Sequence, residues 1–232
     1  MPPASVKIPT SQTSVRIPVD GQISSSTPKT TFRMPAASVQ LHAVDPRRQA
    51  AKRAADLPGP HGEKPDGSHP GIDANGNQDD SSLTEVGWDR AHRLVDLFDP
   101  AQGSPRPGLA RPTAIYAAGA NDNGEGQRTR ETVTPLADKL GIPVNTSFGK
   151  GDEEALVEHV IAQPGPTLIS WQHGEIPTIA DAFPAVTPTP PSEWPDDRFD
   201  VVWTFTKTAD GWQFAQIPEL VLPEDEASVI KD

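Results

Sequence analysis

The sequence predicts a three-layer α/β domain, with a mostly parallel sheet flanked by helices and a C-terminal hairpin. From about residue 83 onward, helical and strand-like segments alternate at short intervals, which is typical of a parallel sheet with crossover helices. Near the end of the chain, two apolar segments flank the turn Asp210-Gly211, and this arrangement indicates an antiparallel hairpin. The 232 residues are enough to bury one core of this kind.

The helices are predicted from apolar residues that recur every three or four positions. In the first helix these residues are Trp88, Ala91, Leu94, Val95 and Phe98. Ser82 or Thr84 can cap its start, because both side chains can accept a hydrogen bond from the first turn. Further helices are expected at residues 127–140, 152–162 and 176–183. Pro135 is expected in a first helical turn with Thr134 as its cap, because proline lacks the N–H that a helix interior requires.

Short apolar runs between the helices predict the strands. They lie at residues 114–118, 144–148, 167–171, 201–206 and 212–217, the last two forming the hairpin. A Pro- and Gly-rich linker at residues 103–112 separates the first helix from the first of these strands.

The N-terminal part of the chain differs in composition from the rest. Residues 1–58 are rich in Pro, Ser and Thr, and basic residues outnumber acidic ones. Such a segment does not bury enough apolar surface to offset the entropy of ordering the chain. We therefore expect a disordered tail at residues 1–58 and the α/β domain at residues 59–232.

Charge and composition restrict the partners. The chain has 32 acidic and 20 basic residues, a formal net charge of −12, which repels nucleic acids and anionic membranes. An anionic substrate must therefore be held by a local cluster of donors. The absence of cysteine excludes thiolate metal sites and thiol nucleophiles. The apolar runs are too short to span a bilayer, so we expect a cytoplasmic protein with neither nucleic acid nor membrane as partner, and nothing indicates its oligomeric state.

Histidine and arginine residues stand at the ends of two predicted strands, where ligands bind in open α/β sheets. The strand at residues 167–171 is followed closely by His173. The strand at residues 114–118 leads through a polar, Gly-rich loop to Arg128 and Arg130 at the start of a helix. Arginines in a first turn oppose the helix dipole, so helix stability does not explain them. Guanidinium groups beside free backbone N–H groups can instead bind an oxyanion.

Four motifs follow one another between about residues 59 and 183. They are His61-Gly62-Glu63-Lys64-Pro65, Leu83-Thr84-Glu85-Val86-Gly87, Arg128-Thr129-Arg130-Glu131-Thr132 with Pro135-Leu136-Ala137, and His173-Gly174. In order and spacing the chain resembles the histidine phosphatase superfamily, which includes phosphoglycerate mutases and acid phosphatases. Each motif alone is weak, but four in the right order over more than half of the chain form a fairly specific signal.

The resemblance implies hydrolysis of a small phosphomonoester in two steps. His61 is then the nucleophile that becomes phosphohistidine, while Arg128 clamps the phosphoryl oxygens and His173 is a second ligand of the same group. Arg130 matches the position of the clamp less well. Imidazole is nucleophilic near pH 7, and positioned cationic donors stabilise a loose phosphoryl transition state. We therefore expect no metal and no other cofactor.

A general acid must protonate the leaving alcohol. Glu175, two residues after His173, resembles the acid of some branches of the superfamily, and it is the acid we favour. Asp152 and Glu153 follow a predicted strand, as the acid does in other branches. Capping of the helix that begins there is the alternative explanation of these two residues, and we prefer it.

The segment before His61 departs from the family pattern. In the family an apolar strand leads directly into Arg-His-Gly, and that arginine is a principal phosphate ligand, whereas here Pro60 stands in its place. Residues 53–59 also make a poor strand. Residues 39–44 could replace it, with His42 at the end mimicking the lost histidine. A second hypothesis is therefore a catalytically degenerate module, a pseudoenzyme that binds phosphate or a partner. A mutase would need a second phosphate site, for which there is no further arginine cluster.

A calcium site is a further possibility that the sequence raises. Residues 73–79 carry oxygen donors at alternate positions, as calcium-binding loops do. However, Gln78 and Thr84 stand where an EF-hand has its glycine and its bidentate glutamate. We therefore expect a solvated turn beside the active site.

Overall fold

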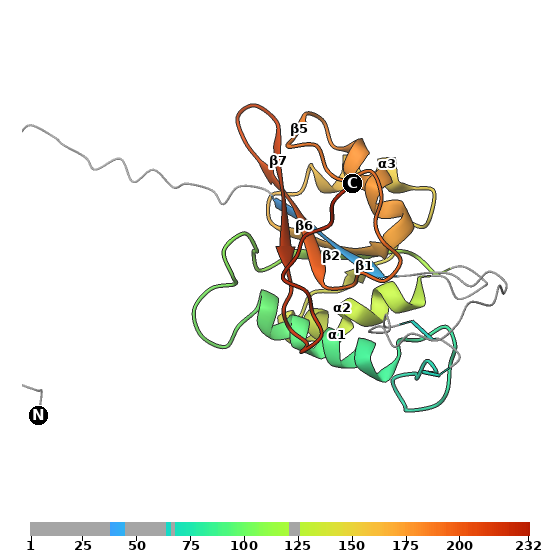
Figure 1. The fold of residues 1–232 in the computed structure, drawn as a ribbon. Coiled ribbons are helices and arrows are strands. Elements are labelled where there is room, and N and C mark those ends of the chain that lie inside the picture. The colour runs from blue at the N-terminus through green and yellow to red at the C-terminus, as the bar shows by residue number, and fades with distance from the viewer. Residues whose placement is uncertain (1–37, 45–63, 66–67, 121–125) are drawn as a thin grey trace, which may run out of the picture. The chain divides into compact units, whose positions relative to one another are not determined.

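A seven-stranded mixed sheet forms the centre of the domain. The computed structural model describes residues 38–44, 64–65, 68–120 and 126–232. The strand order is β3-β2-β4-β1-β6-β7-β5 (Figure 1). Helices cover both faces of the sheet, so the predicted three-layer α/β class is confirmed, including the C-terminal antiparallel hairpin of β6 and β7.

From residue 83 onward the elements follow the predicted order along the chain, with one additional short strand at residues 186–187. The strands are β1 (Ser38–Val44), β2 (Ala114–Ala117), β3 (Val144–Asn145), β4 (Thr167–Gln172), β5 (Val186–Thr187), β6 (Val201–Lys207) and β7 (Trp212–Pro218). The helices are α1 (Glu85–Phe98), α2 (Gln127–Leu140), α3 (Glu153–Val160) and α4 (Ile176–Ala182), and a 3-10 turn, η1 (His173–Glu175), joins β4 to α4. Expected and observed ends differ by a few residues, because an apolar pattern does not determine where an element frays.

The strands that carry the candidate residues are parallel neighbours. β4 pairs in parallel with β1 on one side and with β2 on the other, and β3 pairs in parallel with β2. β6 runs antiparallel to both β1 and β7. The carboxyl ends of β1, β2, β3 and β4 therefore meet at one edge of the sheet, here named the carboxyl edge.

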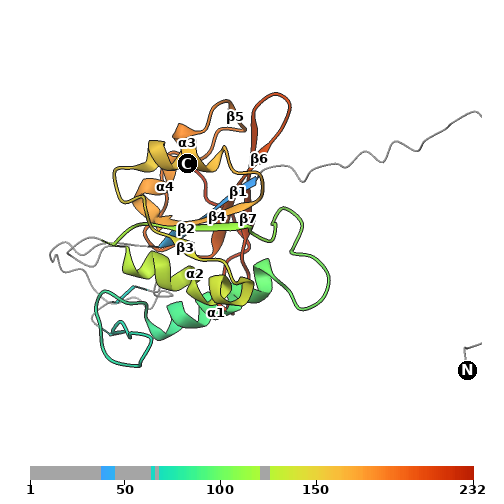
Figure 2. The ribbon, with the colours of Figure 1, turned by 180° about the vertical axis from the view of Figure 1, so that it is seen from behind.

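The direction of each crossover explains which face its helix covers. The connections from β1 to β2 and from β2 to β3 both run toward the β3 end of the sheet, and α1 and α2 lie together on one face (Figures 1 and 2). The connection from β3 to β4 runs back, and α3 lies with α4 on the opposite face. Crossovers of one hand require this exchange of faces when the direction reverses.

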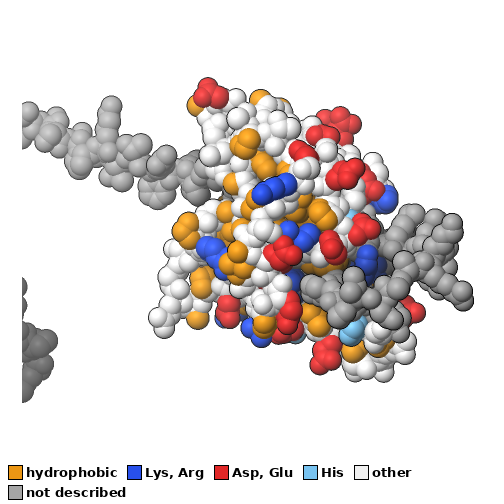
Figure 3. Space-filling view, in the orientation of Figure 1, with side chains coloured by type: hydrophobic (Ala, Val, Ile, Leu, Met, Phe, Trp, Pro, Cys, Tyr) orange, Lys and Arg blue, Asp and Glu red, His pale blue; other side chains and the backbone are white. Residues whose placement is uncertain are grey.

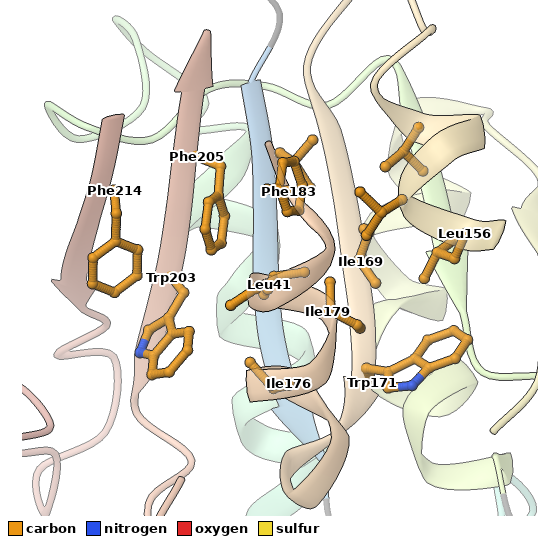
Figure 4. Packing of buried hydrophobic residues seen from close by; sticks show 14 of the residues in the cluster. Leu41, Leu156, Ile169, Trp171, Ile176, Ile179, Phe183, Trp203, Phe205 and Phe214 are labelled. Carbon is orange, nitrogen blue, oxygen red and sulfur yellow. The ribbon is translucent and has the colours of Figure 1, made fainter. Parts of the chain in front are cut away.

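The larger apolar core lies between the sheet and the α3–α4 layer. Figure 4 shows Leu41, Ile169 and Trp171 of the central strands directed toward this layer. Phe183 stacks on Phe205 with 4.5 Å between the ring centroids. Trp171 is fully buried and belongs to this core.

Pro135 lies inside α2 and not in a first helical turn, so the position expected for this proline is wrong. The Thr134 hydroxyl does not cap a helix but donates to the carbonyl of Arg130, 2.8 Å away. A proline inside a helix costs about 3 kcal/mol. Burial of Val133, Leu136 and neighbouring apolar side chains against α1 and the sheet offsets this cost.

The folded unit begins before the boundary expected at residue 59. Residues 38–44 lie within the expected tail, but they form β1 and pair with β4 on one side and β6 on the other. Val39 and Leu41 are almost fully buried, so these residues are part of the core. β1 is stabilised by pairing with a strand on each side, and the composition of the surrounding segment does not reveal this pairing.

Candidate functional site

The carboxyl edge brings two of the predicted site residues to neighbouring strand ends. His173 follows directly after β4. Arg128 is the second residue of α2, the helix that follows β2. β2 and β4 are adjacent parallel strands, with Ala117 facing Ser170 near their ends. His173 and Arg128, distant in sequence, therefore lie at the same edge of the sheet, where open α/β sheets bind ligands.

His173 is held in a defined orientation by a loop on its C-terminal side. Its side chain is buried, and the ring atom Nε2 lies 2.8 Å from Oδ1 of Asp196. Asp196 itself is mostly exposed. A carboxylate on one ring nitrogen selects the tautomer and fixes the ring plane. Sequence reasoning missed Asp196, because the loop that carries it has no motif.

Arg128 is fixed at the start of α2. Its NH1 group donates to the backbone carbonyl of Asp80, 3.2 Å away. The Arg128 carbonyl accepts from the hydroxyl of Thr132, 2.8 Å away, within the same helix. Arg130 is exposed. The first turn of α2 thus places one guanidinium group beside the carboxyl edge.

A network of polar side chains joins α2 to the segment before α1. Glu131 is buried, and its Oε1 atom accepts from the Ser82 hydroxyl at 2.9 Å and from Gln127 Nε2 at 3.0 Å. Its Oε2 atom accepts from the backbone N–H of Leu83 at 2.9 Å. Gln127 Nε2 also donates to Oδ2 of Asp79, 2.9 Å away. The sequence shows Glu131 as part of a motif but does not reveal its partners.

The loop at residues 71–83 is tightly folded. Gly71 is required there, because a Cβ atom on it would lie 2.1 Å from the carbonyl oxygen of Asp79. The backbone N–H of Ser81 and then Gln127 hold the pKa of the Asp79 carboxyl below its usual range. Bonds from Asn77 likewise lower the pKa of Asp73. These amide donors occupy the carboxylate oxygens of Asp73, as in a solvated turn.

The three candidates for the general acid have different surroundings. Glu175 Oε1 lies 2.6 Å from Nζ of Lys150, which follows β3 at the same edge. Glu153 is buried, and its carboxylate accepts from the Trp171 indole at 3.1 Å and from the Gly151 N–H at 2.9 Å. Asp152 accepts from the Gly149 N–H at 2.9 Å. Glu153 and Asp152 therefore order the start of α3, whereas Glu175 lies in the same 3-10 turn as His173.

The nucleophile candidate His61 and the preceding Pro60 lie outside the described residues. The structure does identify the central strand, which is β1, and residues 45–60 separate it from His61. The alternative strand at residues 39–44 is therefore the observed one. Its histidine, His42, does not reach the carboxyl edge, because it is buried in the body of the strand opposite Ser170.

His42 belongs to a buried ionic cluster that also contains Arg90, Glu219 and Asp225. Nδ1 of His42 lies 2.6 Å from Glu219 Oε1, and Arg90 NH1 donates to Glu219 Oε2 at 2.8 Å. Arg90 also binds Asp225 with both terminal nitrogens, at 2.6 and 3.2 Å. The cluster joins β1 and α1 to the segment that follows β7. It is structural, so the idea that His42 replaces the catalytic histidine is not supported.

Asp225 carries a perturbed acidity. Burial would raise the pKa of its carboxyl, but Arg90 and the amides of Leu222 and Val221 outweigh this effect and hold the pKa below the usual value of 3.8. The unfolded chain then takes up a proton at a higher pH than the folded chain. The stability that this carboxylate contributes is complete above its ordinary pKa and is lost as the pH falls through the folded value.

The chain as a whole is acidic, with a formal net charge of −12. Figure 3 shows acidic side chains interspersed with Lys and Arg on the visible face. A phosphate group would therefore depend on local donors such as Arg128. No described helix combines the length and the apolar character needed to cross a membrane. Within the described ranges, three or more His, Asp or Glu side chains do not gather into a metal-binding group.

Comparison with known proteins adds no assignment. The chain matches no protein-family model, and no curated protein matches it.

Proposed function

We propose that this protein hydrolyses a small phosphomonoester at the carboxyl edge through a phosphohistidine intermediate on His61. Arg128 and His173 bind the phosphoryl group. The observation that supports the proposal is the position of these two residues, directly after β4 and at the start of the helix that follows the adjacent β2. The role of each residue is the one that the resemblance carried by the four motifs implies.

The proposed reaction has two balanced steps. Nε2 or Nδ1 of His61 forms a bond to phosphorus as the bond to the alcohol oxygen breaks, and Glu175 gives the alcohol its proton. Water then attacks phosphorus and gives a proton back to Glu175, the N–P bond breaks, and inorganic phosphate leaves. Arg128 and His173 face the negative charge that spreads over the three phosphoryl oxygens, which is where positioned donors accelerate phosphoryl transfer.

A second candidate is a phosphate-binding module without turnover. The observation that favours it is the position of β1: this central strand ends at Val44, and residues 45–60 lie between its end and His61 in the sequence. Pro60, which has no charge and no side-chain donor, also stands where the family has an arginine. By analogy, an arginine finger at a transferred phosphoryl group contributes about 10³ to 10⁵ in rate. Its loss could leave binding without measurable hydrolysis.

The test is hydrolysis of an aryl phosphate by the wild-type protein and three variants. The proposal predicts activity that is lost in His61→Ala, reduced by about 10³ or more in Arg128→Ala, and unchanged in His92→Ala, an exposed histidine of α1. Activity that survives His61→Ala refutes the phosphohistidine mechanism. Phosphate binding without activity in the wild type supports the second candidate, and the absence of both contradicts the proposed site.

A further inference from the structure

We infer that Glu131 is a positioning residue for Arg128, and that it acts by fastening the loop at residues 71–83 to the first turn of α2. The inference rests on the proposed phosphate site. It adds that the orientation of Arg128 in this site depends on a carboxylate that does not touch the anion. A negative charge three residues from Arg128 would repel phosphate if its oxygens pointed to the ligand. They are instead directed at donors of the loop.

Both carboxylate oxygens of Glu131 are engaged in hydrogen bonds within the protein. One carboxylate oxygen accepts from Ser82 Oγ and Gln127 Nε2, at 2.9 and 3.0 Å, and the other from the Leu83 N–H at 2.9 Å. Glu131, Ser82 and Leu83 are all buried. A buried carboxylate that accepts three hydrogen bonds holds its donors firmly, because water does not reach the site to replace these bonds. Removal of this side chain would leave buried donors without an acceptor.

The loop at residues 71–83 is held by hydrogen bonds between its own backbone groups. The bonds of Glu131 with Ser82 and Leu83 therefore also restrict the position of the rest of the loop. The Ile72 N–H donates to the Leu83 carbonyl at 2.8 Å, and the Asp79 N–H donates to the Gly71 carbonyl at 2.9 Å. Trp88 of α1 donates its indole N–H to the Ile72 carbonyl at 2.7 Å. The loop is thus closed on itself and held between the starts of α1 and α2.

The same loop contacts Arg128 through Asp80, two residues before Ser82. Asp79 binds Gln127, the carbonyl of Asp80 binds Arg128, and Ser82 binds Glu131. These three contacts follow the same order along the loop and along the start of α2. If Glu131 no longer holds Ser82 and Leu83, the Asp80 carbonyl loses its fixed place, and Arg128 loses an acceptor that orients its guanidinium group.

The experiment compares Glu131→Gln with the matched control Asp138→Asn, which changes an exposed carboxylate of the same helix. Loss of one hydrogen bond corresponds to about fivefold. We expect the Leu83 amide to exchange its hydrogen at least about fivefold faster in Glu131→Gln, and binding of inorganic phosphate to weaken about fivefold. Asp138→Asn should match the wild type in both.

A double-mutant cycle separates positioning from general destabilisation. In an Arg128→Lys background, Glu131→Gln should change phosphate affinity by less than about twofold, because the group through which it acts is gone. Equal effects in both backgrounds overturn the inference, and so does unchanged affinity in Glu131→Gln. If Glu131→Gln does not fold, Ser82→Ala must show the same coupling to Arg128. A wild-type protein that does not bind phosphate refutes the proposed function and the inference together, whereas the other failures refute the inference alone.

Discussion

Replacement of Arg90 by methionine should destabilise the domain strongly. Arg90 and Glu219 have side chains that are 6% and 0% exposed, so their pairing takes place away from water. Methionine keeps much of the length of the arginine side chain but leaves the carboxylates of Glu219 and Asp225 without their cation. Removal of one partner of a buried ion pair costs about 3–5 kcal/mol, because an uncompensated charge remains inside.

The contacts that remain in Arg90→Met place the expected loss of stability near the lower end of the range of about 3–5 kcal/mol. Glu219 keeps His42 Nδ1 at 2.6 Å, and Asp225 keeps the N–H groups of Val221 and Leu222 at 2.7 and 2.9 Å. We therefore expect a loss of about 3 kcal/mol in the free energy of unfolding. With a denaturant dependence of about 2 kcal/mol per molar urea, the unfolding midpoint should fall by about 1.5 M.

The matched control is Arg93→Met, one turn along α1. Arg93 pairs with Asp89 at 3.0 Å, but both side chains are 52% exposed, and such a pair contributes about 0.3–0.5 kcal/mol. Urea unfolding followed by circular dichroism measures both variants. Equal midpoints for Arg90→Met and Arg93→Met would refute the idea that the buried cluster anchors the segment after β7.

Two further predictions concern acid stability and the loop. Because the folded pKa of Asp225 lies below 3.8, Asp225→Asn should lower stability at neutral pH and flatten its decrease below about pH 4, as measured by urea unfolding across pH. A wild-type slope in the variant would contradict the assignment. Gly71→Ala should lose about 1–3 kcal/mol, since its Cβ would lie 2.1 Å from the Asp79 carbonyl oxygen, whereas the control Gly149→Ala meets its first neighbour at 3.8 Å. Equal melting temperatures for these two variants would rule out the close approach.

Local patterns were sufficient to predict most of the elements. The apolar residues of α1 recur at helical spacing, and Thr84 caps the helix by accepting from the Gly87 N–H at 3.2 Å. The strands β2 and β4 were predicted within one residue at each end. In these cases the signal lies within a few neighbouring residues, and packing against the sheet does not override it.

The errors arose where distant residues decide the structure. β1 has polar Gln40 and His42 on one face, and these are accommodated by the Ala110 backbone and by Glu219, far along the chain. Pro135 is tolerated within α2 because its helix is buried against α1 and the sheet. The partners of Glu131 and His173, namely Ser82 and Asp196, likewise depend on tertiary contacts. No spacing rule along the sequence encodes such pairs.

The most direct test of the central claim is a crystal structure of the wild-type protein with orthovanadate, which imitates a phosphoryl group in transfer. The proposed site predicts vanadate at the carboxyl edge, in contact with the guanidinium group of Arg128 and the imidazole of His173 and bonded to a nitrogen of His61. Vanadate bound elsewhere, or crystals in which this edge takes up no anion, would contradict the claim that these residues form a phosphate site.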